Sequence, residues 1–412
     1  MTVFLPFALG YCLSFLFRTV NAVIAEELTR DLGLGAASLG VLTSAYFISF
    51  AAFQLPLGIL LDRYGPRRVE AALLLVAAAG ALLFGLGDSL TALAAGRALI
   101  GLGVSACLMG AFTANVQWWP RDRLPLVNGL TMAFGGLGAV LATTPVAALL
   151  PSTGWRGLFL GLAAITLATA ALLFLTVPER RDGAHPAATL GTLARGTAEV
   201  FASRAFWRMI PACMLVQGTM MAYIGLWIAG WLRDVAGLDR AAMAEVLQWA
   251  AAALGVGYLG TGAVVSLLEH RLGVPARVTA FTAMGISLAI LGLLAFQAVE
   301  WPGLWAIYPL FATAAATLYA ILSRDFPAER AGRVNTAVNV MSFISAFVLQ
   351  AGIGAVIALF PADEARGHRV ALFAVLTLQA AAWLWGVWPR RRDRGRRQAT
   401  TSSGSATAAP DS

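Results

Sequence analysis

The chain has 412 residues, of which 59% are hydrophobic and only 12% are charged. A soluble domain carries about one-quarter charged residues, so water is not the main solvent of this protein. The formal net charge is +8, and all 29 basic residues are arginines. Because a phosphate-cradling loop needs a lysine, this composition excludes an ATP-driven pump formed by this chain alone.

Apolar stretches long enough to cross a membrane recur along the whole chain. About 20 residues of helix, at 1.5 Å each, match the roughly 30 Å hydrocarbon core. Lipid offers the backbone no hydrogen-bond partner, so these stretches must be helices. We therefore predict an all-α membrane protein with twelve transmembrane helices. The predicted spans are residues 3–25, 37–61, 69–88, 90–115, 125–150, 156–178, 207–232, 243–268, 275–298, 302–323, 334–360 and 370–388.

The placement of the arginines predicts the orientation. If alternate loops lie on opposite sides, 21 arginines fall on one side and six on the other, with two inside spans. The positive-inside rule then places both termini in the cytoplasm, for a multi-pass protein of the plasma (inner) membrane. A basic face toward anionic lipid explains the charge better than nucleic-acid binding, because the sequence lacks an interleaved aromatic and basic surface pattern.

The predicted spans contain no recognisable catalytic cluster. The three histidines, His185, His270 and His368, all fall in predicted loops. The sequence shows neither a nucleophile and base pair nor a metal-ligand spacing. We therefore expect no enzyme activity, no bound metal and no cofactor.

The longest polar stretch, residues 179–206, divides the chain into two predicted bundles of six helices. The bundles cover residues 1–178 and 207–389, and the polar stretch is expected to be a cytoplasmic linker. The basic tail of residues 390–412 has too little apolar content to fold, so we expect it to be disordered.

Short motifs return in the second bundle at nearly one displacement. Arg63-Tyr64-Gly65 returns 208 residues later as Arg271-Leu272-Gly273. Residues 119–123 and the pair Val127-Asn128 both return 207 residues later. Each match lies at the same edge of the corresponding helix, which indicates a membrane protein built from two repeated halves.

The segment from Gly58 to Arg68 reads G-I-L-L-D-R-Y-G-P-R-R. It resembles the loop signature G-x-x-x-D-R-x-G-x-R-R of the major facilitator superfamily. A glycine at position 58 would let helices approach closely, and Asp62 can accept charge-assisted hydrogen bonds that latch one conformation. A solvated basic turn would explain the arginines but not the spacing of Gly and Asp. The predicted gating residues are Gly58, Asp62, Arg63, Gly65, Arg67, Arg68 and Arg97.

Arg97 lies inside the fourth span, followed by Gly101 and Gly103 in a pattern that resembles the family signature R-x-x-x-G-x-G. A charged residue inside a span is costly and usually faces a cavity or a partner. The alternative is that Arg97 snorkels to the interface. Arg97, Gly101 and Ser105 recur every four residues, so we expect them on one helix face.

The resemblance covers residues 3–389 and implies two six-helix bundles around a central cavity. It also implies a monomeric secondary active transporter that moves a small solute by alternating access, with a coupling ion or an exchanged anion as a further partner. The alternatives are a drug or metabolite efflux antiporter and, more remotely, a channel-like facilitator. Drug exporters of this family often carry a Gly-Pro pair in the fifth helix, whereas this span contains Thr144-Pro145, which weakens the efflux alternative.

Carboxylates fall only at the ends of the predicted spans. Glu26 and Glu27 end the first span, Glu70 begins the third and Glu245 begins the eighth. Proton coupling through a buried acid is therefore not expected, and the sequence favours exchange or uniport.

Tyr11, Ser14, Arg18 and Asn21 follow one another at steps of three, four and three along the apolar first span. Such spacing places four polar groups on one helix face, which we expect to line the central cavity. A guanidinium near the middle of a span is costly unless water or an anion meets it, so Arg18 predicts a negatively charged substrate. The alternative is that Arg18 snorkels outward or bonds neighbouring carbonyls as a structural pin.

The seventh span bears on the kind of anion. Organic-phosphate antiporters of the superfamily carry a first-helix arginine and a second arginine in the seventh helix. Here the middle of the seventh span offers only Gln217, Tyr223 and Trp227, which favours a small carboxylate or an inorganic anion over a phosphate ester.

Further polar residues of the second half could line the pathway. Asn335 and Asn339 lie one helical turn apart, and Ser342 extends their stripe. The alternative role for these residues, and for Gln248 in the eighth span, is hydrogen bonding between helices. The predicted substrate-binding residues are Tyr11, Arg18, Asn21, Gln217, Trp227, Asn335 and Asn339.

Overall fold

The computed structural model describes residues 2–120, 123–178, 198–297, 301–326 and 331–388. Within these ranges every regular element is a helix, which confirms the all-α prediction. Most of the predicted linker and the whole predicted tail lie outside the described residues.

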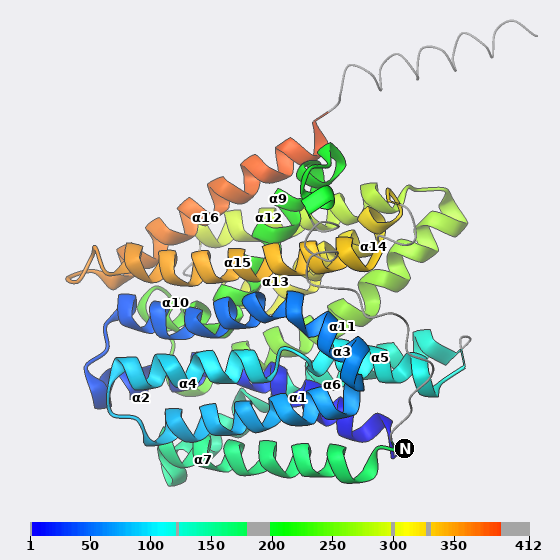
Figure 1. Cartoon of the computed structure of the whole chain (residues 1–412). Coiled ribbons are helices and arrows are strands. Elements are labelled where there is room, and N and C mark those ends of the chain that lie inside the picture. The colour runs from blue at the N-terminus through cyan, green and yellow to red at the C-terminus, as the bar shows by residue number, and fades with distance from the viewer. Residues whose placement is uncertain (1, 121–122, 179–197, 298–300, 327–330, 389–412) are drawn as a thin grey trace, which may run out of the picture.

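The helices α1–α7 form the first half of the molecule (Figure 1). They follow one another through short connections, as the alternation of apolar runs and brief polar segments requires. Their bounds are α1 (Phe4–Thr19), α2 (Asn21–Leu32), α3 (Ala36–Leu86), α4 (Leu90–Gly103), α5 (Cys107–Trp118), α6 (Leu124–Leu141) and α7 (Thr144–Thr176).

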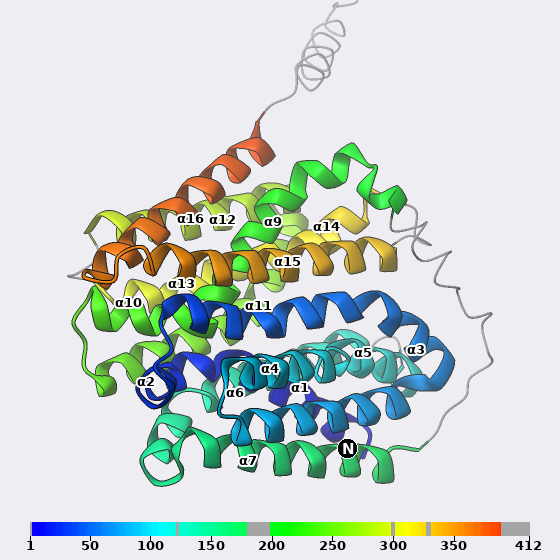
Figure 2. The same cartoon turned by 60° about the vertical axis from the view of Figure 1, so that its left-hand side comes forward.

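The helices α9–α16 form the second half, which lies beside the first in both views (Figures 1 and 2). It includes a π-helical turn, η2, and a 3₁₀ turn, η4, inside otherwise α-helical spans. The bounds are α9 (Arg204–Ala222), η2 (Tyr223–Trp227), α10 (Ile228–Asp234), α11 (Arg240–Leu272), α12 (Ala276–Gln297), α13 (Leu304–Ala312), η4 (Thr313–Ala316), α14 (Thr317–Ser323), α15 (Ala331–Ile357) and α16 (Glu364–Val387).

Ten helical segments in the described part of the chain are long and apolar enough to cross a membrane. The bent pair α1 and α2 raises this number to eleven when it is taken as one span. The region of the fifth predicted span contains the shorter apolar helix Val127–Leu141. The protein is therefore a multi-pass helical membrane protein, and the count of twelve spans stays a prediction.

Several spans expected to be continuous are bent or broken. The first span bends by 45° between α1 and α2 and runs on to Leu32, so Glu26 and Glu27 do not end it. The fourth span breaks between Gly103 and Cys107, where α4 ends and α5 begins. Glycine lowers helix propensity by about 1 kcal/mol, which favours a break after the paired glycines of α4. Ser105 lies in the turn between α4 and α5, and the expectation that it shares one face with Arg97 and Gly101 stays a prediction.

Glycines with positive φ mark sharp changes of direction inside two long segments. Gly65 (φ 77°) separates the second and third predicted spans within α3. Gly154 (φ 61°) separates the fifth and sixth predicted spans within α7. Because side chains with a Cβ rarely adopt this conformation, glycine is the residue that permits each kink.

The two halves meet along α3 and α15, which pack in antiparallel register. Gly40 lies opposite Gly354, Phe50 stacks on Phe343, and the Asn339 amide donates to Gln54 Oε1 at 3.0 Å. A second contact joins α6 and α11. We call the end of the molecule where α16 begins the distal end, and the end where α1 begins and α16 stops the terminal end.

An arginine contacts the last helix of each half. Arg67 donates from Nε and Nη2 to the Phe174 carbonyl in the last turn of α7, at 2.9 and 2.6 Å. Arg277 donates to the Gly386 carbonyl in the last turn of α16, at 2.8 Å. Each cation satisfies a helix carbonyl that has no intrahelical partner.

Candidate functional site

Arg18 lies near the end of α1, at the boundary between the two halves. Its side chain is buried, and its Cζ lies 4.6, 5.7 and 5.2 Å from the ring centroids of Phe15, Phe50 and Phe343. Aromatic faces attract a cation but do not neutralise it. In the described part of the chain no carboxylate pairs with Arg18, and its Nε has no hydrogen-bond partner. Arg18 is therefore a buried cation beside the Tyr46 hydroxyl, without a carboxylate as counter-ion among the described residues.

Both halves contribute to the space beside Arg18. A small cavity of about 10 Å³ is lined by Phe15, Arg18 and Thr19 of α1 together with residues of the second half, which are Met220, Met221, Ile224, Gly225, Leu254 and Tyr258. A Cβ on Gly225 would lie 3.3 Å from the Arg18 carbonyl, so the π-helical turn η2 passes close to α1.

The other residues of the predicted first-helix stripe are buried as well. Tyr11 packs edge-on against Phe15, with ring centroids 5.1 Å apart. Asn21 donates to Thr43 Oγ1 at 2.9 Å, within the first half. The Ser14 carbonyl accepts from the Tyr46 hydroxyl at 3.3 Å. Within the stripe, Arg18 contacts aromatic side chains of both halves.

A polar cluster connects the halves on the terminal side of Arg18. Tyr319 of α14 places its hydroxyl 3.4 Å from Gln217 Oε1 and 3.3 Å from Asn339 Oδ1. The Asn339 amide in turn donates to Gln54 of the first half. One turn further, Asn335 accepts from Ser323 at 3.0 Å. The structure therefore brings predicted residues Gln217 and Asn339 together, and gives Asn335 a partner within the second half.

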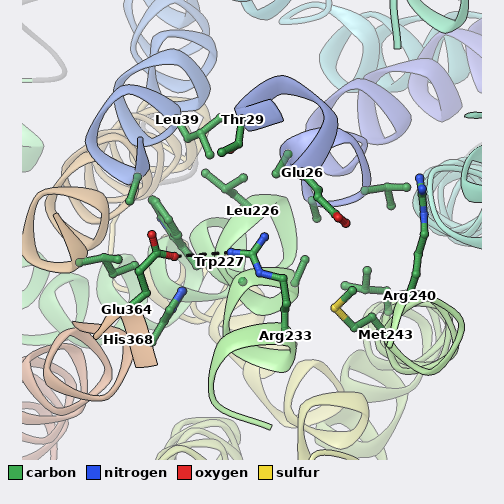
Figure 3. Close-up of a pocket in the computed structure, with 18 of the residues that line it drawn as sticks. Glu26, Thr29, Leu39, Leu226, Trp227, Arg233, Arg240, Met243, Glu364 and His368 are labelled. Atoms are coloured by element: carbon green, nitrogen blue, oxygen red, sulfur yellow. Dashed lines mark ion pairs between the residues drawn. The ribbon is translucent and has the colours of Figure 1, made fainter. Parts of the chain in front are cut away.

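A larger cavity, of about 110 Å³, lies between the halves at the distal end. Figure 3 shows Arg233 and Glu364 directed toward one another, with Trp227 and His368 beside them. Trp227, a predicted substrate-binding residue, lines this cavity, and its indole donates to the Gln350 carbonyl at 3.0 Å. The remaining lining residues named in the close-up are Glu26, Thr29, Leu39, Leu226, Arg240 and Met243.

Ion pairs surround the distal cavity and were not foreseen from the sequence. Arg233 bonds its neighbour Asp234 at 2.6 Å and approaches Glu364 at 3.6 Å. A second pair joins Arg240 of α11 to Glu27 of α2 and so connects the two halves. Glu27 lies on α2, beyond the bend in the first span, where it reaches Arg240 of α11. No short sequence pattern predicts that contact.

The residues of the loop signature differ in their surroundings, and their gating role stays a prediction. The side chain of Asp62 lies outside the described residues. Gly58 is exposed, and a Cβ there would meet nothing within 4 Å, so the expected close helix approach at this glycine is wrong for this conformation. The Cζ atom of Arg63 lies 5.3 Å from the centroid of the Tyr64 ring. Arg68 also interacts with a neighbouring group.

Arg97 is completely buried inside the first half. It donates to the Phe17 carbonyl at 2.9 Å, and its Cζ lies 5.2 Å from the Tyr46 ring centroid. The snorkelling alternative is therefore wrong, because a side chain without exposed surface does not reach the interface. A Cβ on Gly101 would collide with the Tyr46 carbonyl, so this glycine is needed where α4 meets α3.

Two further candidates form contacts between helices. Tyr223 stacks on Trp305 within the second half, with ring centroids 4.7 Å apart. Gln248 accepts from the Thr144 hydroxyl at 2.7 Å across the halves. The expectation that no acid is buried needs correction, because Glu70 is completely buried inside the first half.

The chain belongs to the Major Facilitator Superfamily, because the sequence model of that family matches residues 7–350. Members of the family and the relatives that match this chain are transporters rather than enzymes. The family thus agrees with the resemblance of the loop signature and with the arrangement of the helices.

Individual relatives match parts of the chain. A probable sulfoacetate transporter of Cupriavidus necator is 26% identical over 159 residues, which are 39% of this chain and 37% of that protein. The 4-hydroxybenzoate transporter PcaK of Pseudomonas aeruginosa is 33% identical over 157 residues, which are 38% of this chain and 35% of that protein. The chain thus spans little more than a third of the length of these curated relatives.

The fold is similar to that of a solved transporter. A bacterial homolog to the human lysosomal transporter Spinster, in an inward-facing and unoccupied conformation, superposes with a TM-score of 0.73 at 20% identity. The match covers 93% of this chain and 95% of that chain. At this identity the likeness concerns the fold alone.

Proposed function

We propose that this protein is a secondary active transporter of a small organic anion that works by alternating access. The observation that carries the proposal is Arg18, a buried guanidinium between the halves without an ion-pair partner in the described part of the chain. A charge in this position costs several kcal/mol unless water or a counter-ion meets it. A bound carboxylate or sulfonate would supply that counter-ion.

The walls around Arg18 favour an organic rather than an inorganic anion. Phe15, Phe50 and Phe343 surround the guanidinium with ring faces, and Tyr258 lines the adjoining cavity. Apolar surface of this kind binds the body of a ligand, while a few polar groups fix its orientation. The names of two partial relatives, a sulfoacetate transporter and a 4-hydroxybenzoate transporter, support the same substrate class.

A route from the distal cavity to Arg18 supports the transport mechanism. The distal cavity and a smaller one share Ala22, Val23 and Leu247 in their walls. The smaller cavity shares Thr19 and Ile224 with the space beside Arg18. On the terminal side the Phe50 and Phe343 rings and the bond between Gln54 and Asn339 join the halves. We infer that these contacts form one gate and that Glu27 with Arg240 belongs to the opposite gate.

The same proposal includes the orientation of the protein in the membrane and its division into two six-helix bundles. Both termini lie in the cytoplasm, so the distal cavity faces the outside of the plasma (inner) membrane. Residues 1–178 and 207–389 act as the two moving bundles of a monomer, and the loop residues Asp62, Arg63 and Arg67 contribute to gating.

A ligand panel tests the substrate class. Purified protein is heated with sulfoacetate, 4-hydroxybenzoate, a sugar and an organic cation, because a ligand that binds the folded state raises its stability. Ligands that stabilise are then tested in proteoliposomes for counterflow. We expect stabilisation and saturable counterflow with an organic anion only. Counterflow of the cation or of the neutral sugar, without counterflow of either anion, would contradict the proposal.

A further inference from the structure

Glu70 lies in the interior of the first half, on the part of α3 that follows the kink at Gly65. Its side chain has no exposed surface. A Cβ built on Gly10 of α1 would lie 2.5 Å from Glu70 Oε1, and a Cβ on Gly110 of α5 would collide with Oε2. Two neighbouring helices therefore approach this carboxyl group closely, each at a glycine.

In the described surroundings of Glu70, no cationic side chain pairs with its carboxyl group. Among the described residues, none lies at a distance and angle that would make a regular hydrogen bond to either carboxyl oxygen of Glu70. The Cys107 thiol at the start of α5 lies beside it, and a thiol is a weak donor. On α1, Arg18 and Tyr11 are charged or titratable groups that interact electrostatically with Cys107. Arg67 of α3 itself bonds the Phe174 carbonyl instead.

This environment suits a proton better than a metal cation. A hard cation such as Ca²⁺ takes about six to eight oxygen ligands, whereas this site offers two carboxyl oxygens, a thiol and glycine Cα atoms. The described residues contain no cluster of metal-ligating groups. An ionised carboxylate buried without a partner would be strongly unfavourable, so the packed arrangement requires the neutral acid.

A continuous set of contacts joins Glu70 to the gate between the halves. Cys107 begins α5 directly after the break in the fourth span. Within that break the Ser105 carbonyl accepts from the Gln54 amide at 3.4 Å. The same Gln54 accepts from Asn339 across the halves. Movement at the break can therefore reach both the carboxyl group and the gate.

We propose that Glu70 is the proton-binding site that couples anion transport to proton movement. When α1 and α5 separate from α3 and water enters, the carboxylate takes one proton on an oxygen atom, and the packed state holds this proton until the site opens to the other side. The inference rests on the proposed function. One proton moving with a monoanion such as 4-hydroxybenzoate adds no net charge to the transport step, and one proton moving with a dianion such as sulfoacetate offsets one of its two charges. It replaces the expectation of uniport or simple exchange.

Proteoliposome assays with Glu70→Gln test this coupling, because glutamine resembles the protonated acid but cannot release a proton. Counterflow of 4-hydroxybenzoate or sulfoacetate needs no net proton transfer and should be retained. Accumulation driven by a pH gradient should be lost, at least tenfold below the wild type. Glu245→Gln makes the same chemical change at an exposed position and should retain both activities.

The outcomes separate this inference from the proposed function. If the wild-type protein catalyses no counterflow of either anion, the proposed function fails. If counterflow occurs but Glu70→Gln still accumulates the anion along a pH gradient, or if a sodium gradient replaces the pH gradient, the proton site is wrong.

An infrared measurement tests the protonation of Glu70 without any substrate. The wild-type protein should show the carbonyl stretch of a protonated carboxyl group at neutral pH, and this band should be absent from Glu70→Gln but present in Glu245→Gln. If Glu70→Gln does not fold, Glu70→Asp replaces it, and the band should shift. An unchanged spectrum in the folded Glu70 variant would overturn the proposal.

Discussion

The rings of Phe50 and Phe343 stack face to face, with centroids 3.9 Å apart and planes inclined by 11°. Phe50 comes from α3 and Phe343 from α15, so the stack joins the two halves of the molecule. The Arg18 guanidinium lies within 5.7 Å of both ring centroids. The cation that we propose as the substrate-binding group therefore lies against the rings that join the halves.

Loss of this stack should favour separation of the halves on the terminal side. An aromatic pair contributes about 0.5–1.5 kcal/mol beyond its buried area, so Phe50→Ala or Phe343→Ala should shift the conformational equilibrium by roughly 2- to 12-fold. The double variant should shift it little further, since both changes remove one contact. Fluorescence energy transfer between labels on the terminal loops measures the shift.

Phe296→Ala provides the control, because Phe296 pairs with Phe373 inside the second half, with ring centroids 4.8 Å apart. It removes a ring contact without crossing the halves. Equal shifts in all three single variants, or strictly additive effects in the double variant, would show that the stack is not a gate.

Asn339 should become accessible to water during transport. In a background without the three buried cysteines, Asn339→Cys should react with a water-soluble thiol reagent, and a transported anion should slow the reaction. Val348→Cys on the same helix is exposed on the molecular surface and should remain unlabelled if that surface faces lipid. Complete absence of labelling at position 339 under every transport condition would exclude it from the pathway.

The pair between Arg240 and Glu27 should matter more than an ordinary surface ion pair. Glu27 is only 6% exposed, so Arg240→Gln leaves a nearly buried carboxylate without its partner. Exposed pairs contribute about 0–1 kcal/mol, whereas unpairing a buried charge costs several kcal/mol. We expect impaired transport for Arg240→Gln and partial recovery in the exchanged pair Glu27→Arg with Arg240→Glu.

Arg30→Gln serves as the comparison, because Arg30 is well exposed and pairs with the adjacent Asp31. Transport rates normalised to membrane abundance are the measurement. Wild-type rates in Arg240→Gln would mean that the distal pair has no part in gating.

Arg67 and Arg277 should stabilise the two halves in the same way. A cation at a helix C-terminus contributes about 0.3–1 kcal/mol, so alanine at either position should lower the melting temperature of the purified protein by a similar, small amount. Arg63→Ala, which removes a cation over a ring rather than a helix cap, should have a smaller effect. A large change from one capping arginine and none from the other would argue against equivalent roles.

The sequence predicts the architecture well because lipid restricts the backbone to helices. Apolar length therefore identifies most spans, and the glycine kinks at Gly65 and Gly154 fall between predicted spans. The breaks are harder to foresee. The bend after Thr19 and the π-helical turn at Tyr223–Trp227 depend on packing between helices rather than on local composition.

The candidate site is predictable only in part. Arg18 is recognisable in the sequence because a guanidinium in the middle of a span is costly without water or a counter-ion. Its burial between the halves is compatible with the expected position at the central cavity. The burial of Glu70 is not predictable from its position beside the loop motif. The glycines that lie against its carboxyl group, Gly10 and Gly110, come from distant segments of the chain. The contact between Glu27 and Arg240 spans 213 residues, and no single-sequence pattern reports such a pairing.

The most direct test of the central claim is anion counterflow by purified Arg18 variants in proteoliposomes. Arg18→Ala should lose uptake of the transported anion by at least tenfold, and Arg18→Lys should retain part of it, because lysine keeps the charge but not the fork of donors. Arg369→Ala, at an exposed position of α16, should behave as the wild type. Wild-type counterflow in both Arg18 variants would contradict the account.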